Sequence, residues 1–294
     1  MRRIFLWTAL LAACEQTVDN QKPVGSHTDS EAEVERYVRR AYLDLSGRPP
    51  SDADLDATTV RLREQNNTAA VRATFVDELI AKDEYATLWV EELENAILGG
   101  NTLEQQYQFV CSIVRGQDRA CDSCTQQDSC KCTCNILPTL DAERTDLMKV
   151  KADFKANVAT SDIERRYAMA TGYFILSGGP EGRVSALFDD FLSRPAEADE
   201  IENGRAMIFG AIFPGAPAGL MFHRHGSNYA DMIDIIFDSE VYRESMVRRV
   251  FGRYLAREPS SVELAHFVTT LDATKPDMRS LVRAVLSSRE YFDQ

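Results

Sequence analysis

Six cysteines in the middle of the chain are the residues with the clearest capacity for chemistry. The six are Cys111, Cys121, Cys124, Cys130, Cys132 and Cys134. The last five lie within fourteen residues, and the segment that carries them is polar, with no aliphatic or aromatic side chain. Such a segment cannot order itself by burial, so an even number of cysteines favours disulfide bonds that cross-link it. Their pairing is left open by the sequence.

A metal site is the alternative for the same cysteines. Cys121-x-x-Cys124, followed by the alternating Cys130, Cys132 and Cys134, could wrap zinc or copper(I), because soft thiolates select these ions. The spacing fits no standard zinc finger, and Thr125 stands where covalent haem attachment needs histidine. Disulfides are favoured, and metal binding or an accessory role in electron transfer remains the alternative.

The N-terminus has the form of a secretory signal peptide over residues 1–13. Arg2 and Arg3 precede a short apolar run, which is about half of the roughly 20 residues that a membrane-spanning helix needs. Leu11-Ala12-Ala13-Cys14 resembles the lipobox of bacterial lipoproteins. The resemblance implies that Cys14 becomes the first residue of the mature protein and carries fatty acyl chains such as palmitate.

This lipid anchor would set where the protein works. Two or more acyl chains hold a protein stably at a membrane. Residues 14–30 are polar, which is typical of a tether. We therefore expect a peripheral protein of the bacterial cell envelope, on either membrane, bound to the membrane by its N-terminal lipid. That compartment is oxidising, which supports the disulfide interpretation.

The composition excludes one class of partner. The chain has 294 residues, 44% of them hydrophobic and 27% charged, and a net charge of −13. So acidic a surface argues against binding to nucleic acid. The length allows one large domain or two small ones.

An internal repeat is the most informative pattern in the remaining sequence. Counted from Val38, Val184 and Val247, three segments share five positions. These are an aromatic residue at +4, an apolar residue at +7, Arg at +10, an acid at +16 and an aliphatic residue at +17. Each segment then closes with an apolar block that leads to Tyr85, Tyr242 or Tyr291.

The repeat predicts small helical units. Apolar residues at +0, +4 and +7 lie on one face of a helix, and a proline near the arginine ends that helix. Ser51 and Ser260, each followed three residues later by an acid, predict the start of the next helix.

The shared arginines are Arg48, Arg194 and Arg257. They could form an anion site. Alternatively, each arginine could bond the carbonyl groups at the end of the first helix or pair with the acid at +16, which we favour.

The repeat resembles two bacterial domain families of unknown function. One recurs in secreted and cell-surface proteins and has a closing segment like residues 287–292; the other accompanies planctomycete-type cytochrome modules and has a stretch like residues 40–50. The resemblance covers residues 31–92 and 183–294, and neither family brings a known catalytic residue set. We expect an all-α fold with three divergent copies of a helical unit and a disulfide-rich insert. The predicted segments are 31–100, 101–182 (a helical linker with the insert at 111–134), 183–243 and 244–294.

Two further stretches bear on function. Residues 210–226 form an apolar insert rich in Gly and Pro, which is either an exposed contact surface or a loop packed on the core. Its His223-x-His225 is weak evidence for a metal site. Residues 161–176 read as one helix opened by a capping box at Ser161.

No serine elbow, phosphate-binding loop or His-Glu-x-x-His motif is present. The sequence thus favours a non-catalytic scaffold with a protein or cell-wall partner and no cofactor, although an enzyme stays possible.

Overall fold

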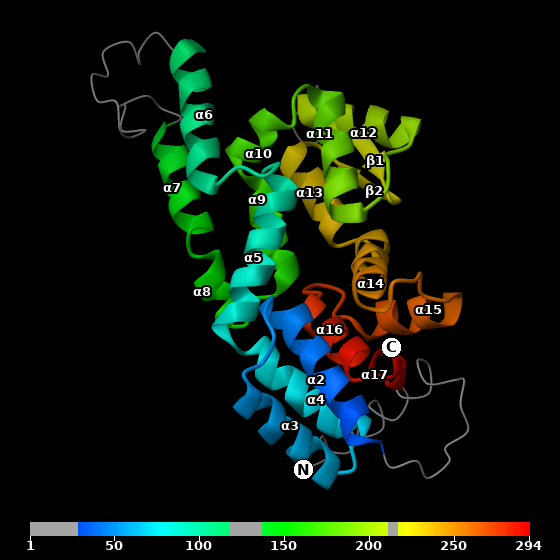
Figure 1. Cartoon of the computed structure of the whole chain (residues 1–294). Coiled ribbons are helices and arrows are strands. Elements are labelled where there is room, and N and C mark those ends of the chain that lie inside the picture. The colour runs from blue at the N-terminus through cyan, green and yellow to red at the C-terminus, as the bar shows by residue number, and fades with distance from the viewer. Residues whose placement is uncertain (1–28, 118–136, 211–216) are drawn as a thin grey trace, which may run out of the picture. The chain divides into compact units, whose positions relative to one another are not determined.

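The computed structural model describes residues 29–117, 137–210 and 217–294, and these residues are mostly helical (Figure 1). They form two compact units, which we call unit 1 and unit 2. Unit 1 is the described part of Met1–Leu88 together with Met246–Gln294, and unit 2 is Trp89–Ser245. The chain passes between the units inside two long helices, α5 (Asp83–Ile97) and α14 (Glu240–Leu255).

Unit 1 brings the two ends of the chain together. Besides its parts of α5 and α14, it holds α2 (Glu31–Ser46), α3 (Asp52–Glu64), α4 (Ala69–Ile80), α15 (Ser261–Thr270), α16 (Met278–Leu286) and α17 (Arg289–Asp293). Helix α4 packs on α16, and α17 packs on α2. The Tyr37 ring lies against Phe75, Tyr291 and Phe292 in this core, and its hydroxyl donates to the Leu286 carbonyl at 3.1 Å.

Local sequence explains the first helices. Helix α2 begins at Ser30, whose hydroxyl accepts a hydrogen bond from the Glu33 amide, and it ends at Gly47 with a φ of +67°. A left-handed residue just after a helix is usually glycine, because other side chains clash there. The hydroxyls of Ser51 and Ser260 open α3 and α15 in the same way, as the sequence predicted.

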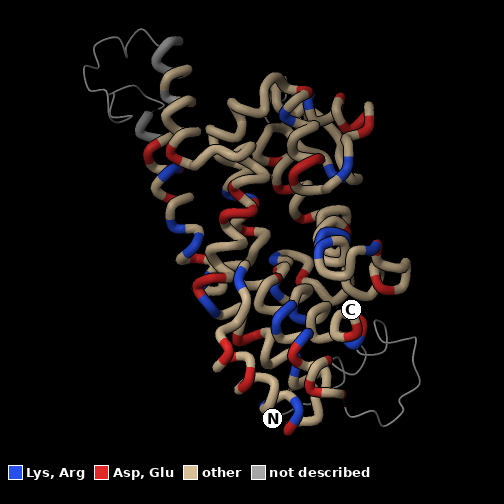
Figure 2. Tube along the Cα trace, in the orientation of Figure 1, with Lys and Arg blue, Asp and Glu red and all other residues tan. Residues whose placement is uncertain are grey.

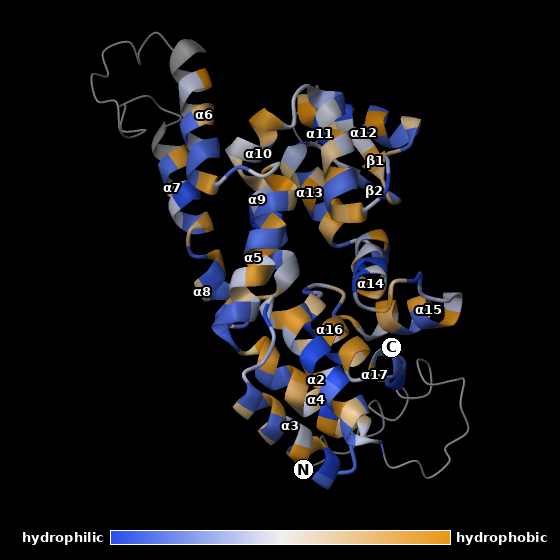
Figure 3. Ribbon diagram, in the orientation of Figure 1, coloured by the Kyte–Doolittle hydropathy of each residue, from blue (hydrophilic) through white to orange (hydrophobic). Residues whose placement is uncertain are grey.

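Unit 2 is helical except for one short hairpin. Besides its parts of α5 and α14, it holds α6 (Leu103–Gln117), α7 (Leu137–Leu147), α8 (Val150–Lys155), α9 (Thr160–Met169), α10 (Thr171–Leu176), α11 (Pro180–Leu187), the π-helical turn η2 (Phe188–Leu192), α12 (Ala198–Phe209), β1 (Gly219–Met221), β2 (Arg224–Gly226) and α13 (Tyr229–Phe237). Helix α12 packs on α11, β1 and α13, and α13 packs on α9. Along the helices of both units, apolar positions recur at helical spacing (Figure 3).

Two local predictions were wrong. Residues 161–176 are not one helix, because the chain breaks at Ala170, whose ψ of 136° is extended. Ser161 does not cap this segment: it is buried inside α9, which begins after Ala159. The strands β1 and β2 were also not predicted, since three residues are too few to show alternation.

Candidate functional site

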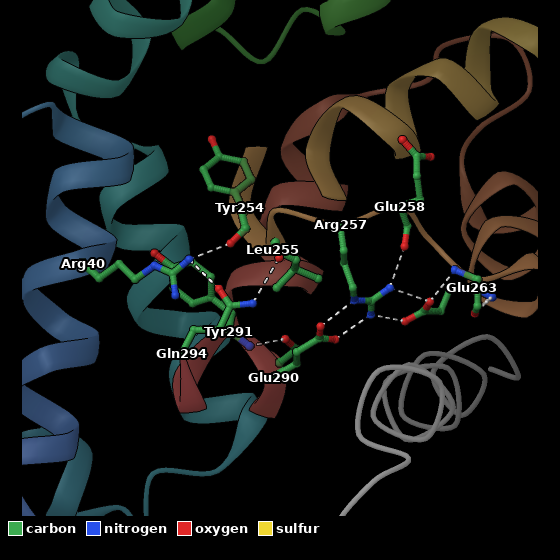
Figure 4. Close-up of polar contacts among 11 residues, drawn as sticks. Arg40, Tyr254, Leu255, Arg257, Glu258, Glu263, Glu290, Tyr291 and Gln294 are labelled. Atoms are coloured by element: carbon green, nitrogen blue, oxygen red, sulfur yellow. Dashed lines mark hydrogen bonds and ion pairs between the residues drawn. The ribbon is translucent and has the colours of Figure 1, made fainter. Parts of the chain in front are cut away.

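Arg257, after the end of α14, is the most heavily bonded of the three repeat arginines (Figure 4). Its guanidinium donates to Glu290 at 2.5 and 2.6 Å and to Glu263 at 2.7 and 3.0 Å. A fifth bond of 2.9 Å goes to the Glu258 carbonyl, and the guanidinium lies over the Phe251 ring, 5.1 Å from its centroid. The hydrogen bonds that Arg257 donates to Glu290 and Glu263 raise the pKa of its guanidinium above the usual value.

Arg194 has the same kind of environment in unit 2. Its guanidinium donates to both oxygens of Glu200, at 2.8 and 2.6 Å, and to the Pro195 carbonyl at 3.1 Å. It lies 4.8 Å from the centroid of the Phe188 ring. Arg194 and Arg257 thus both pair with the acid at +16, one of the two partners that the sequence offered as the alternative to an anion site.

Arg48 differs from the other two. It pairs with Glu84 of α5, whereas the acid at its +16 position, Asp54, accepts from the Ser51 hydroxyl at 2.7 Å. Glu84 directly precedes Tyr85, just as Glu290 precedes Tyr291, so Arg48 uses one of the two partners that Arg257 combines. In all three cases the guanidinium bonds a carboxylate of the same unit, and this arrangement stabilises turns between helices.

A second set of polar contacts was not predicted from the sequence. Four buried tyrosines donate their hydroxyls to carboxylates far away in the chain, at 2.6–2.8 Å. The pairs are Tyr291 with Asp44, Tyr173 with Asp190, Tyr242 with Glu164, and Tyr167 with Glu94. The sequence marked Tyr242 and Tyr291 as shared positions, but it gave no sign of their partners.

Burial shifts the acidity of these groups. It is the main cause of the raised pKa of Tyr173 and Tyr291, and the neighbouring carboxylates add to it. Burial also raises the pKa of Asp190, although the Tyr173 hydroxyl partly opposes this. The ionised form of Asp190 is therefore less favourable in the folded unit than in water.

The hairpin of unit 2 lies directly against α12. A side-chain atom on Gly226 would come within 2.8 Å of the Met207 sulfur, and one on Gly219 would collide with the Asn203 carbonyl. Met221 is buried, and the Leu220 amide donates to the Asn203 side chain at 2.8 Å. The backbone of the hairpin is thus fixed to the helix.

Some side chains at the end of α12 and in the hairpin are exposed. Phe209, at the end of α12, has 72% of its surface exposed, and Leu220 has 43%. His223 and His225 are also exposed. The two alternatives for the insert stay open, because residues 211–216 lie outside the described residues; of the others, Met221 is packed and Leu220 faces solvent.

Several predicted residues lie outside the described residues. These are Cys14 and the five cysteines from Cys121 to Cys134; Cys111 lies in α6. Disulfides and the alternative metal site therefore stay predictions. Among the residues that the structure does describe, no three His, Cys, Asp or Glu gather in a way that could hold a metal ion.

Charge and hydropathy complete the description. Acidic and basic residues are interspersed along the described chain (Figure 2). None of the helices in the described ranges is both long and apolar enough to cross a membrane.

The fold defines the class only broadly, as a mostly helical protein with arginine–carboxylate and tyrosine–carboxylate contacts between its helices. Residues 16–111 match the model of the family described as PSCyt2, a protein of unknown function (DUF1549). The match supports the resemblance to a domain of unknown function and stops before the five clustered cysteines. No curated protein and no solved structure matches the chain.

Proposed function

We propose that this protein is a lipid-anchored scaffold of the bacterial cell envelope that binds a protein or cell-wall partner through unit 2. The observation that carries the proposal is the exposure of Phe209, at the end of α12, and of Leu220 in β1, a strand whose backbone is fixed to α12. Apolar side chains held in place and left uncovered are typical of contact surfaces, because they bind without a large loss of conformational entropy.

As part of this proposal, the three segments are copies of one helical unit. Two observations support it. The residue at +13 opens the second helix in each segment, as Ser51, Glu197 and Ser260. The arginine at +10 bonds a carboxylate in each segment as well. A helical unit of this size needs neighbours to bury its apolar side, so repeated units make a scaffold.

The partner surface is tested by affinity capture from detergent-solubilised membranes. We expect Phe209→Asp to reduce recovery of the partner on the order of ten-fold, as loss of one apolar contact residue does. Val262→Asp is the matched control, because Val262 is 67% exposed and lies in unit 1. Equal recovery with both variants, or recovery of the protein alone from the unmodified chain, contradicts the proposal.

The lipid anchor is tested at Cys14. With Cys14→Ser no acyl chain can be attached, so we expect the protein to leave the membrane fraction, whereas Cys111→Ser should stay bound. Fractionation and mass spectrometry of the mature N-terminus measure this. Unchanged membrane binding of the Cys14 variant would show that the lipobox interpretation is wrong.

The six remaining cysteines are tested by thiol titration and metal analysis of protein purified from the envelope. Disulfides predict six blocked thiols and no bound metal. Free thiols together with stoichiometric zinc or copper would instead establish the metal-binding alternative.

A further inference from the structure

We infer that residues 89–176 contain a fourth copy of the helical unit, so that unit 1 and unit 2 are each a pair of copies with equivalent contacts at their third helices and closing tyrosines; Gly99 stands where the other copies have arginine. In unit 1 the first copy packs with the third, and in unit 2 the fourth packs with the second. The inference rests on the repeat in the proposed function and not on its membrane anchor or partner.

The third helices of the paired copies give the first evidence. Arg283 of α16 bonds Asp77 of α4 at 2.8 Å, and both residues lie eight positions before a closing tyrosine, Tyr291 or Tyr85. Two equivalent positions that contact one another are the mark of twofold pairing.

Unit 2 repeats this contact. Arg165 of α9 bonds Asp234 of α13 at 2.5 Å. Asp234 lies eight positions before Tyr242, and Arg165 lies eight positions before Tyr173. Helix α9 therefore stands where α16 stands in unit 1, and Tyr173 corresponds to the closing tyrosine.

The closing tyrosines give independent evidence. Tyr291 donates to Asp44, which lies six residues after Val38, at 2.6 Å. Tyr173 donates to Asp190, which lies six residues after Val184, at 2.8 Å. The same hydroxyl thus reaches the same position of the partner copy in both units.

A third contact joins the start of one third helix to the end of the other. Arg72 and Tyr229 both lie thirteen residues before a closing tyrosine. Arg72 donates to the Ser287 carbonyl at 2.8 Å, and Tyr229 donates to the Ala168 carbonyl at 2.7 Å. Ser287 directly follows α16, and Ala168 is the next-to-last residue of α9, so the two carbonyls lie four and five residues before Tyr291 and Tyr173.

The second helix of the fourth copy is α6. It begins with reciprocal bonds between Thr102 and Gln105, at 2.9 and 3.2 Å, as α15 begins with Ser260 and Glu263. The unit boundary also falls three residues after Tyr85 in α5 and three after Tyr242 in α14. Residues 89–97 of α5 are thus the first helix of the fourth copy, just as residues 246–255 of α14 are the first helix of the third copy.

This assignment explains where the two inserts occur. The connection between second and third helices is short in unit 1, at 65–68 and 271–277. In unit 2 it is 118–159, which carries the five clustered cysteines and the helices α7 and α8, and 210–228, which carries the hairpin. Insertions in repeat proteins often map to the face that binds a partner. Of the two pairs, unit 2 is the one that carries insertions.

A single substitution tests the equivalence of the closing helices. The hydroxyls of Ser288 and Ser239 accept from the amides of Tyr291 and Tyr242, but Ala170 holds that place before Tyr173 and offers no cap. In the full chain, Ala170→Ser should raise Tm by about 2–4 °C, and Ser288→Ala should lower it similarly. A lower Tm for Ala170→Ser would overturn the inference.

A graft tests the whole block. Residues 281–292 replace residues 163–174 in the full chain, with Glu164 and Tyr167 retained because they bond Tyr242 and Glu94. The control places the same block one residue earlier. We expect one cooperative thermal transition for the graft and its loss in the control. If the graft and the shifted control both unfold cooperatively, or both lose the cooperative transition, the fourth copy is refuted. Neither readout depends on partner capture.

Discussion

Arg257 illustrates how one arginine can join two parts of a fold through its hydrogen bonds. Its guanidinium bridges Glu263, six residues away, and Glu290, which belongs to the last helix of the chain. A hydrogen bond to a charged group contributes about 1.5–3 kcal/mol, and the bonds made by one guanidinium do not add independently. The arginine therefore joins a turn to a distant helix of the same unit.

Substitution measures this role. Arg257→Met should lower the free energy of unfolding by about 1–3 kcal/mol, because it leaves two carboxylates without their main cation. Arg248→Met is the control, because Arg248 pairs with the exposed Glu258. This substitution should change the free energy of unfolding by about 0.5 kcal/mol or less. Urea denaturation compares the two, and equal effects would contradict the structural role of Arg257.

Asp190 predicts a pH dependence. Its pKa is raised in the folded state, so the unfolded chain ionises first and the folded state loses stability as pH rises through the shifted pKa. Asp190→Asn removes this effect and can still accept from Tyr173. The stability of the variant relative to the unmodified protein should rise from below the ordinary pKa of 3.8 to pH 7.

Asp56→Asn serves as the control, because Asp56 is exposed and is not among the groups that shift the pKa of Asp190. Chemical denaturation at several pH values gives the comparison. A relative stability of the Asp190 variant that falls toward neutral pH would have the wrong sign and would show that the Tyr173 bond dominates.

At the scale of elements, glycine decides how closely two helices approach. A side-chain atom on Gly204 of α12 would lie 2.5 Å from a methyl carbon of Val184 and 3.2 Å from the Met232 sulfur. The crossing of α11, α12 and α13 therefore depends on the absence of that atom.

Gly204→Ala should consequently lower the free energy of unfolding by about 1–3 kcal/mol through overpacking. Gly252→Ala in α14 is the matched control, because nothing lies within 4 Å of its added atom. Alanine is the better helix former, so the control should gain about 0.5–1 kcal/mol. Thermal denaturation distinguishes the opposite signs, and a stabilised Gly204 variant would contradict the close crossing.

The hairpin shows why some elements escape sequence reasoning. Its turn is formed by Phe222 and His223, with φ values of 47° and 62°. Two-residue hairpin turns of this kind normally carry Asn or Gly. The usual signal is therefore missing. The hairpin is held by distant parts of unit 2: the Leu220 amide donates to Asn203 of α12, and the Phe222 ring lies 6.0 Å from the Phe188 ring of η2.

At the scale of the whole molecule, unit 1 is discontinuous in sequence and unit 2 is continuous. Unit 2 with the whole of its two shared helices is the segment 83–255. Because its core contacts are internal, we expect this segment to fold alone and to unfold cooperatively. Residues 29–88 and 246–294 should be ordered only when mixed, because α4 packs on α16 and α17 on α2.

Circular dichroism of the three fragments, singly and mixed, tests this division. Helical structure in either terminal fragment alone that does not increase on mixing would contradict the paired core of unit 1. An unfolded 83–255 fragment would contradict the independence of unit 2.

The sequence by itself determined the local features of this protein. It predicted the helix starts at Ser51 and Ser260, and it offered the acid six residues on as one of two partners for the shared arginines, which is the partner seen for Arg194 and Arg257. These features depend on residues within one or two helical turns of each other. Short offsets in sequence then fix distances in space, because helix geometry is constant.

Only the tertiary structure decided which segments pair. Arg283 bonds Asp77 across 206 positions, and Tyr291 bonds Asp44 across 247. The residues read as a linker, 101–182, also supply α9 as the packing partner of α13. Such contacts follow from burying the apolar faces of all helices together, and no local pattern encodes that arrangement.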